Sequence, residues 1–236
     1  MVKLITLKND WKQITREPIM IILFLCPVLI AVIFRLLTVF LMPVIFRYFN
    51  QSFIPFMPYA LSLSLIFCPM MLGIVMGFMM LDDKDGKIIE LMSVTPLTKQ
   101  GYMINRLLFI VGATILHTTL SYIIMGQYIF TLSSFLLVTI ILSTLAIVIG
   151  LVFFSLATDK IKGLTYAKGL NLIVIFTFAD LLKGAFIKTI SLGFPTYWLA
   201  EIVQNPNQVL AYLFGFTSCL FWLIVVLRIG KFRVNE

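Results

Sequence analysis

The sequence predicts an all-α integral membrane protein. Of its 236 residues, 61% are hydrophobic and only 12% are charged, and the mean hydropathy is +1.08. A soluble domain of this length needs a polar surface, which this composition cannot supply. The apolar runs are continuous rather than alternating, so they predict helices and exclude a membrane β-barrel. We therefore expect one transmembrane domain over residues 1–236, built from several membrane-spanning helices.

The first element is predicted to lie on the membrane and not across it. Within residues 1–17, Leu7, Trp11 and Ile14 recur at helical spacing, and basic residues occupy positions between them. A basic amphipathic helix that carries a tryptophan lies in the membrane interface; an ordinary solvated helix is the alternative. Pro18 then suits the first turn of the next helix.

Six apolar stretches follow, each long enough to be read as a membrane span. The predicted spans are 18–40, 57–80, 107–126, 134–157, 164–186 and 209–227. The third and fourth divide a run that carries no charge from Leu107 to Thr158 and is too long for one helix. In the second span, Gly73 and Gly77 form a GxxxG pattern, which lets helices approach closely in lipid.

For four of the polar residues within or beside these spans, the sequence indicates a role. Arg35 interrupts the first one, and since a central arginine costs about 2.5–3.5 kcal/mol on insertion scales, we expect it to snorkel outward or to face protein. His117 has only uncharged neighbours in the sequence, which favours packing or hydrogen bonding over a proton relay. Asp180 and Lys183 are predicted to pair along one helix face. Lining an outer cavity or bridging to a second subunit is the alternative for this pair.

The distribution of basic residues predicts the orientation. Six spans place both termini on one side, and most of the 18 Lys and Arg residues fall there; the exceptions are Arg35, Arg47, Lys183 and Lys188. The positive-inside rule then makes both termini cytoplasmic, in a multi-pass protein of a bacterial inner membrane. The net charge of +8 indicates contact with anionic lipid of the inner leaflet, and we expect no nucleic acid partner.

The densest cluster of charge lies between the second and third spans, at residues 82–106. A separate helix is predicted to begin at its acidic start, because carboxylates suit a helix N-terminus, and Ile89 and Leu91 contribute to the apolar face of that helix. Thr95 and Pro96 predict a second helix start, as N-cap and first helical position. The second helix would continue into the third span, which suits the transmission of force.

Three segments of the chain form a combination that is typical of one family of membrane proteins. They are the N-terminal helix with its proline-started span (LKNDWKQITREPIMIILFLCP), the charged segment (DDKDGKIIELMSVTPLTKQGYMINR) and the aromatic FPTYW before the last span. With these segments the chain resembles the permease subunit of an ATP-binding-cassette exporter of the type-2 (type V fold) family. The resemblance covers essentially the whole chain and is most specific at Val94–Leu97. Where the family usually has Gly-Thr after the acidic stretch, this chain has Gly86–Lys87.

The resemblance implies that the charged segment is a cytosolic coupling helix, which docks in a groove of a separate ATPase chain. It assigns ATPase coupling to residues of this segment, namely Asp83, Asp85, Gly86, Ile89, Glu90, Leu91, Thr95 and Pro96. It also implies a dimer with a second copy or with a sister permease. Over residues 184–207 it implies short re-entrant helices at the outer face.

The chain contains no nucleotide-binding sequence of the form GxxxxGK[ST]. ATP and Mg²⁺ are therefore expected on the partner ATPase, and we expect no catalytic residue, cofactor or metal in this chain. An intramembrane enzyme would need Ser/His, paired acids or metal ligands, which the sequence does not offer. A secondary transporter or a membrane immunity protein without an ATPase is the remaining alternative, although neither midplane acids nor repeats are visible.

The expected cargo is hydrophobic or amphipathic, such as a drug, a peptide or a lipid. The 22 Phe and 12 Met residues give adaptable apolar surfaces that suit such molecules. The direction of transport, out of the cell, is implied by the resemblance.

Overall fold

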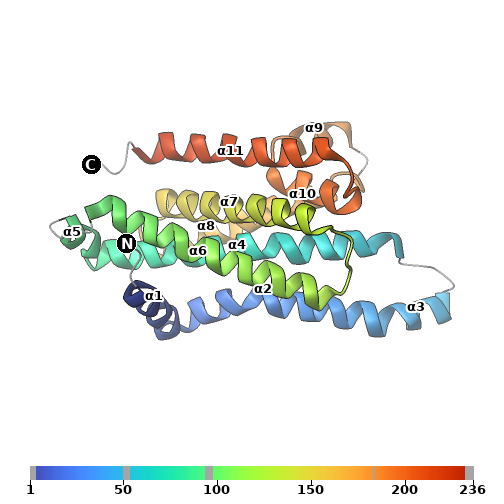
Figure 1. Cartoon of the computed structure of the whole chain (residues 1–236), viewed down its shortest axis with the longest axis horizontal. Coiled ribbons are helices and arrows are strands. Elements are labelled where there is room, and N and C mark those ends of the chain that lie inside the picture. Colours follow the sequence, from blue (N-terminus) through green and yellow to red (C-terminus); the bar gives the residue numbers. More distant parts are fainter. Residues whose placement is uncertain (1–3, 50–53, 94–97, 183, 232–236) are drawn as a thin grey trace.

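All elements of the described chain are helices (Figure 1). The computed structural model describes residues 4–49, 54–93, 98–182 and 184–231, and no strand occurs among them. Six helical stretches in these ranges are long and apolar enough to cross a membrane: Pro18–Val44, Met57–Asp85, Gly101–Met125, Leu132–Leu156, Lys160–Phe178 and Val209–Arg228. The predicted all-α architecture with six candidate spans is confirmed.

The described residues form a succession of helices. In chain order they are α1 (Leu4–Arg16), α2 (Pro18–Leu36), the π-helical η1 (Leu37–Leu41), α3 (Met42–Phe49), the 3-10 helix η2 (Ile54–Phe56), α4 (Met57–Asp85), α5 (Ile88–Ser93), α6 (Thr98–Met125), α7 (Leu132–Leu156), α8 (Lys160–Asn171), the 3-10 helix η3 (Leu172–Phe178), α9 (Ala185–Ser191), α10 (Pro195–Gln204) and α11 (Val209–Lys231).

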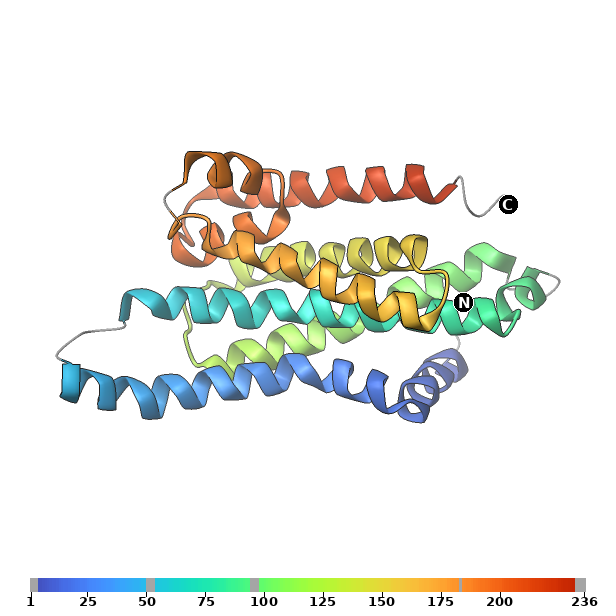
Figure 2. The ribbon, with the colours of Figure 1, turned by 180° about the vertical axis from the view of Figure 1, so that it is seen from behind.

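The chain enters the bundle through an elbow between α1 and α2. Glu17 separates these helices with an extended backbone (φ −115°, ψ 119°), and Pro18 starts α2. Proline is tolerated there because the first turn of a helix needs no N–H donor from it. Figure 2 shows α1 set at an angle to α2, at the same end of the bundle as α5.

Arg35 faces protein, which is one of the two outcomes expected for it. Its Nη1 donates a hydrogen bond of 3.1 Å to the carbonyl of Met125, the last residue of α6. Gly126 follows in the left-handed conformation (φ +64°), where an added Cβ would lie 3.3 Å from the Arg35 guanidinium carbon. Arg35 thus caps a helix end whose carbonyls lack intrahelical partners.

Helix α4 forms the centre of the bundle. Its most apolar window is 89% buried, against 22% for the stretch that contains α2. It packs most extensively on α7, where a Cβ on Gly73 would lie 2.7 Å from the Cβ of Ile149 and one on Gly77 would overlap the Phe153 ring. The GxxxG pattern therefore serves packing within the chain, because only glycine allows this approach.

The short helices α9 and α10 lie at the end of the bundle opposite α5 (Figure 1). They fall within the stretch for which short helices were predicted. The turn between them is held by two tryptophans. Trp222 on α11 donates from Nε1 to the carbonyl of Gly193 at 2.9 Å, and Trp198 on α10 donates to the carbonyl of Leu192 at 2.8 Å.

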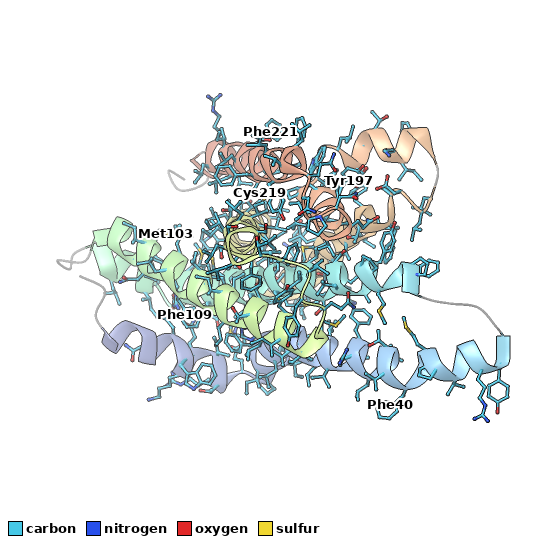
Figure 3. The ribbon with its side chains drawn as sticks, turned by 45° about the vertical axis from the view of Figure 1, so that its right-hand side comes forward. Phe40, Met103, Phe109, Tyr197, Cys219 and Phe221 are labelled. Atoms are coloured by element: carbon cyan, nitrogen blue, oxygen red, sulfur yellow. The ribbon has the colours of Figure 1, made fainter. Side chains whose placement is uncertain are left out.

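Much of the outer surface is apolar. In Figure 3, Phe40 and Phe221 point outward on opposite sides of the molecule, and both are exposed. Cys219, by contrast, is buried against α7. Apolar side chains on the outside as well as the inside are typical of helices that are surrounded by lipid.

Candidate functional site

Charge gathers at one end of the bundle, which we call the charged end. Here α1 and the last turn of α4 meet the beginnings of α6 and α8, around a cavity of about 760 Å³ that is lined mainly by charged and polar residues. The N-terminus and α5 lie at the same end (Figure 1). No other part of the described chain brings as many ionic side chains together.

Arg106 is the buried centre of this end. It lies near the start of α6 and is only 6% exposed. Its Nη1 donates to Asp10 Oδ1 on α1 at 2.6 Å. Its Nη2 donates to Gln13 Oε1, also on α1, at 2.7 Å and to Asp83 Oδ2 on α4. One guanidinium thus joins α1, α4 and α6.

Two uncharged side chains complete the group that we call the Arg106 cluster, which consists of Asp10, Gln13, Asp83, Tyr102 and Arg106. Tyr102, one turn before Arg106, donates its hydroxyl hydrogen to Asp83 Oδ2 at 2.5 Å and accepts a hydrogen bond from Arg106 Nε at 3.3 Å. Gln13 donates from Nε2 to the carbonyl of Met79 on α4 at 3.1 Å. Each charged member is therefore paired and hydrogen-bonded, which is the condition for burying a charge.

Burial imposes a desolvation cost on the charged groups of this cluster and requires that their hydrogen bonds be well aligned. Each ion loses hydration worth several kcal/mol, which mutual attraction and hydrogen bonds must offset. Burial raises the pKa of Asp10 above its usual 3.8, the positive charge of Arg106 opposes that rise, and the negative charge of Asp83 adds to it. A guanidinium suits this place because its planar fork binds two acceptors in a fixed orientation.

A second ion cluster involves the neighbouring residue Asp82. Lys160, the first residue of α8, contacts Glu17 in the elbow and Asp82 Oδ1, the latter at 2.7 Å. The Lys160 side chain is 41% exposed and that of Glu17 is 37% exposed. This Lys160 cluster (Glu17, Asp82 and Lys160) is therefore worth less than a buried pair, since water screens it.

The acidic stretch does not start a new helix, so that prediction is wrong: Asp82 to Asp85 form the last turn of α4. The macrodipole disfavours carboxylates at a helix C-terminus. Arg106 and Lys160, which come from elsewhere in the chain, supply the compensating positive charge. The helix breaks only after Asp85, where Lys87 has a positive φ of 54° and α5 follows.

The residues assigned to ATPase coupling fall into three groups. Asp83 is 3% exposed and belongs to the Arg106 cluster, so its side chain is engaged within the chain. The others that the structure describes lie around the break and on α5, exposed or half-buried: Asp85, Gly86, Ile89, Glu90 and Leu91. Thr95 and Pro96 lie outside the described residues.

Asp180 forms an ion pair at the opposite end of the bundle. Its Oδ1 lies 2.9 Å from Nζ of Lys188 on α9. The hydrogen bond to Asp180 raises the pKa of Lys188. The predicted partner of Asp180, Lys183, lies outside the described residues. The pair with Lys188 joins the turn after η3 to α9, a connection not predicted from the sequence.

His117 is buried inside the bundle. Its Nδ1 lies 2.9 Å from the carbonyl of Ala113, and its ring packs edge-to-face on Phe24 with centroids 4.6 Å apart. These surroundings fit the packing and hydrogen-bonding role predicted for it. Over the described ranges, no group of three or more His, Cys, Asp or Glu side chains is placed to hold a metal ion.

The sequence shows Arg106 and Asp10 only as charged residues and does not reveal the cluster that they form. Two signals could have found it. Asp10 is the only acid in α1, which is otherwise basic. Arg106 is the last charge before the uncharged run that begins at Leu107. A charge at the edge of a span requires a partner if it is buried, and these two have opposite signs.

Six apolar helices, tied together at one end by buried and half-buried ion pairs, define a multi-pass helical membrane protein. The chain belongs to the family described as fluoroquinolones export permease protein Rv2686c-like, whose model matches residues 10–228. This membership supports an ABC-type permease, as the resemblance implied, and makes the chain an export permease. Comparison with curated proteins and with solved structures gave no significant match.

Proposed function

We propose that this chain is the permease subunit of an ATP-binding-cassette exporter with the type-2 (type V) fold, driven by a separate ATPase chain that docks on α5. The observation that carries the proposal is the exposed position of α5 at the charged end. Leu91 on this helix is 61% exposed. Ile88, one turn earlier on the same face of α5, is exposed as well, and together these two apolar side chains offer a contact to another protein.

Backbone hydrogen bonds make α5 a direct extension of α4 instead of a free loop. The amide of Gly86 donates to the carbonyl of Asp82 at 2.9 Å, and that of Lys87 donates to the carbonyl of Lys84 at 3.0 Å. The amide of Leu91 donates back to the carbonyl of Lys87 at 3.1 Å. A force applied to α5 is therefore delivered to the end of α4. In the proposed cycle, closure of the ATPase dimer displaces α5, and two permease halves open outward.

The proposed cargo is a hydrophobic or amphipathic molecule. The family's name mentions fluoroquinolones, so an amphipathic drug is the first candidate. The proposed second permease, another copy or a sister chain, would cover part of the exposed apolar surface, and lipid would cover the rest. ATP and Mg²⁺ would bind to the ATPase and not to this chain.

The positive-inside rule places the charged end, with α5 and both termini, on the cytoplasmic side of a bacterial inner membrane. An ATPase that acts on α5 must be in the cytoplasm, where ATP is available. The orientation predicted from charge and the proposed docking site therefore agree.

Substituting Leu91→Asp tests the docking contact. We expect the permease to accumulate in the membrane at its usual level, because this side chain does not pack inside the chain, and to lose most of the ATPase that co-purifies with it. Ile161→Asp is the matched control, since Ile161 is also exposed at the charged end, at the start of α8. Equal recovery of ATPase with both variants, or drug efflux that is normal in Leu91→Asp, contradicts the proposed function.

A further inference from the structure

The proposed function leaves open how a displacement of α5 reaches α1. Helix α2 packs directly on α4 and α6, whereas α1 has only sparse contacts with these two helices. The Arg106 cluster joins α1 to them, because Asp10 and Gln13 on α1 bind the same guanidinium as Asp83 on α4.

Stability alone does not account for a buried ion cluster at this place. Well-packed apolar residues of similar volume are often as stabilising as a buried ion pair or triad, or more so. An arginine fork adds directional geometry, since its acceptors must lie at fixed positions around one planar group. Asp10 and Asp83 thereby fix where α1 lies relative to the end of α4.

We propose that Arg106 is a positioning residue, which makes α1, α4 and α6 move as one body at the charged end and so transmits a displacement of α5 to α1. The inference rests on the proposed function, because an ATPase acting on α5 would supply that displacement. The Lys160 cluster links the same turn of α4 to α8, and its loss has a smaller effect because water screens it.

The first test uses the purified permease in lipid nanodiscs without any ATPase. Hydrogen exchange of the α1 amides, followed by mass spectrometry, is faster in Arg106→Gln than in the unaltered chain, because α1 loses an attachment. Arg16→Gln is the matched control, since Arg16 is exposed at the end of α1 and its substitution removes the same charge without touching the cluster. Unchanged exchange in Arg106→Gln overturns the inference.

The second test measures coupling in the complex with the co-purified ATPase. The amount of a fluoroquinolone transported per ATP hydrolysed falls about 2- to 30-fold in Arg106→Gln, the range found for residues within coupling networks. In Arg106→Lys the transport ratio lies between those of Arg106→Gln and the unaltered chain, because an ammonium group keeps the charge but cannot bind two acceptors as the guanidinium does. Lys160→Gln changes the ratio less. Faster exchange in α1 with an unchanged transport ratio overturns the inference.

Two further variants distinguish a failure of this inference from a failure of the proposed function. Asp10→Asn serves if Arg106→Gln does not accumulate in the membrane, because it weakens the hold on α1 and leaves Arg106 paired with Asp83; no change in either readout then overturns the inference. Deleting residues 86–92 tests the proposed function itself. Normal transport per ATP in that deletion refutes the action of an ATPase on α5, whereas the exchange measurement on α1 involves no ATPase.

Discussion

At the scale of single residues, two cations meet adjacent carboxylates of α4 in different surroundings. Arg106 and its partners are buried, and removing one partner of such a buried pair typically costs about 3–5 kcal/mol, because an uncompensated charge is left behind. Lys160 and Glu17 are partly exposed, and pairs of that kind are worth roughly 0–1 kcal/mol. The ion pairs of the two clusters have similar distances, but the Arg106 cluster is buried, so its disruption is expected to cost more stability.

The sequence contains these charged residues, but it does not predict which of them pair with one another. Asp83 is assigned to coupling by the resemblance, yet its side chain is turned into the chain, toward Arg106. Asp10 and Arg106 are separated by 96 positions. Helical periodicity relates residues within one turn or two, so contacts of this range are outside its reach.

Substituting Arg35→Met removes the cap of α6. We expect the free energy of unfolding to fall by about 0.3–2 kcal/mol, since a cation near a helix C-terminus interacts with the macrodipole by that amount. The measurement is a denaturant titration of the purified protein in detergent. Arg47→Met on α3 is the control, because Arg47 is exposed and makes no ion pair among the described residues. An equal loss in both variants would show that the cap contributes nothing.

At the scale of helices, the composition predicts the number of candidate spans well because each needs a long apolar run. It is less informative about where a helix stops. The acidic turn after the second span reads as a helix start, but α4 continues through it because cations from α6 and α8 offset the unfavourable dipole. Ion pairs with distant parts of the chain here outweigh the local preference of acidic residues for a helix N-terminus.

The packing of α4 on α7 is tested by Gly77→Ala. The new Cβ would overlap the Phe153 ring. Overpacking of this kind costs about 1–3 kcal/mol, so the thermal midpoint in detergent should fall. Gly112→Ala is the matched control, because nothing lies within 4 Å of a Cβ at that position. A partial recovery in the double variant Gly77→Ala with Phe153→Leu is expected as well, and its absence would locate the clash elsewhere.

At the scale of the whole molecule, ionic groups and apolar surface are separated. The charged end carries α1, α5 and the start of α8, while α3 and α9 lie at the other end (Figure 2). Between them, apolar side chains cover the outside of the bundle. This arrangement fits a protein that crosses a bilayer, and the proposed ATPase would meet it at the charged end only.

Cysteine labelling tests the orientation. In a variant without Cys26, Cys68 and Cys219, we expect Ile161→Cys, which lies at the charged end outside the proposed docking contact, to react with a membrane-impermeant maleimide only after the cells are opened. Phe186→Cys on α9, also exposed, should react in intact cells. The physical reason is the excess of Lys and Arg on the side that carries α5. The reverse pattern would place α5 outside the cell and remove it from reach of an ATPase.

The paired aspartates at the end of α4 limit how this helix is able to move. Asp82 reaches Lys160, and Asp83 reaches Arg106. Twisting α4 about its own axis by one residue step, about 100°, would take both carboxylates away from their partners at once. Tilting α4 together with its neighbours leaves both contacts in place. The last turn of α4 is therefore able to tilt with its neighbours but not to rotate about the helix axis.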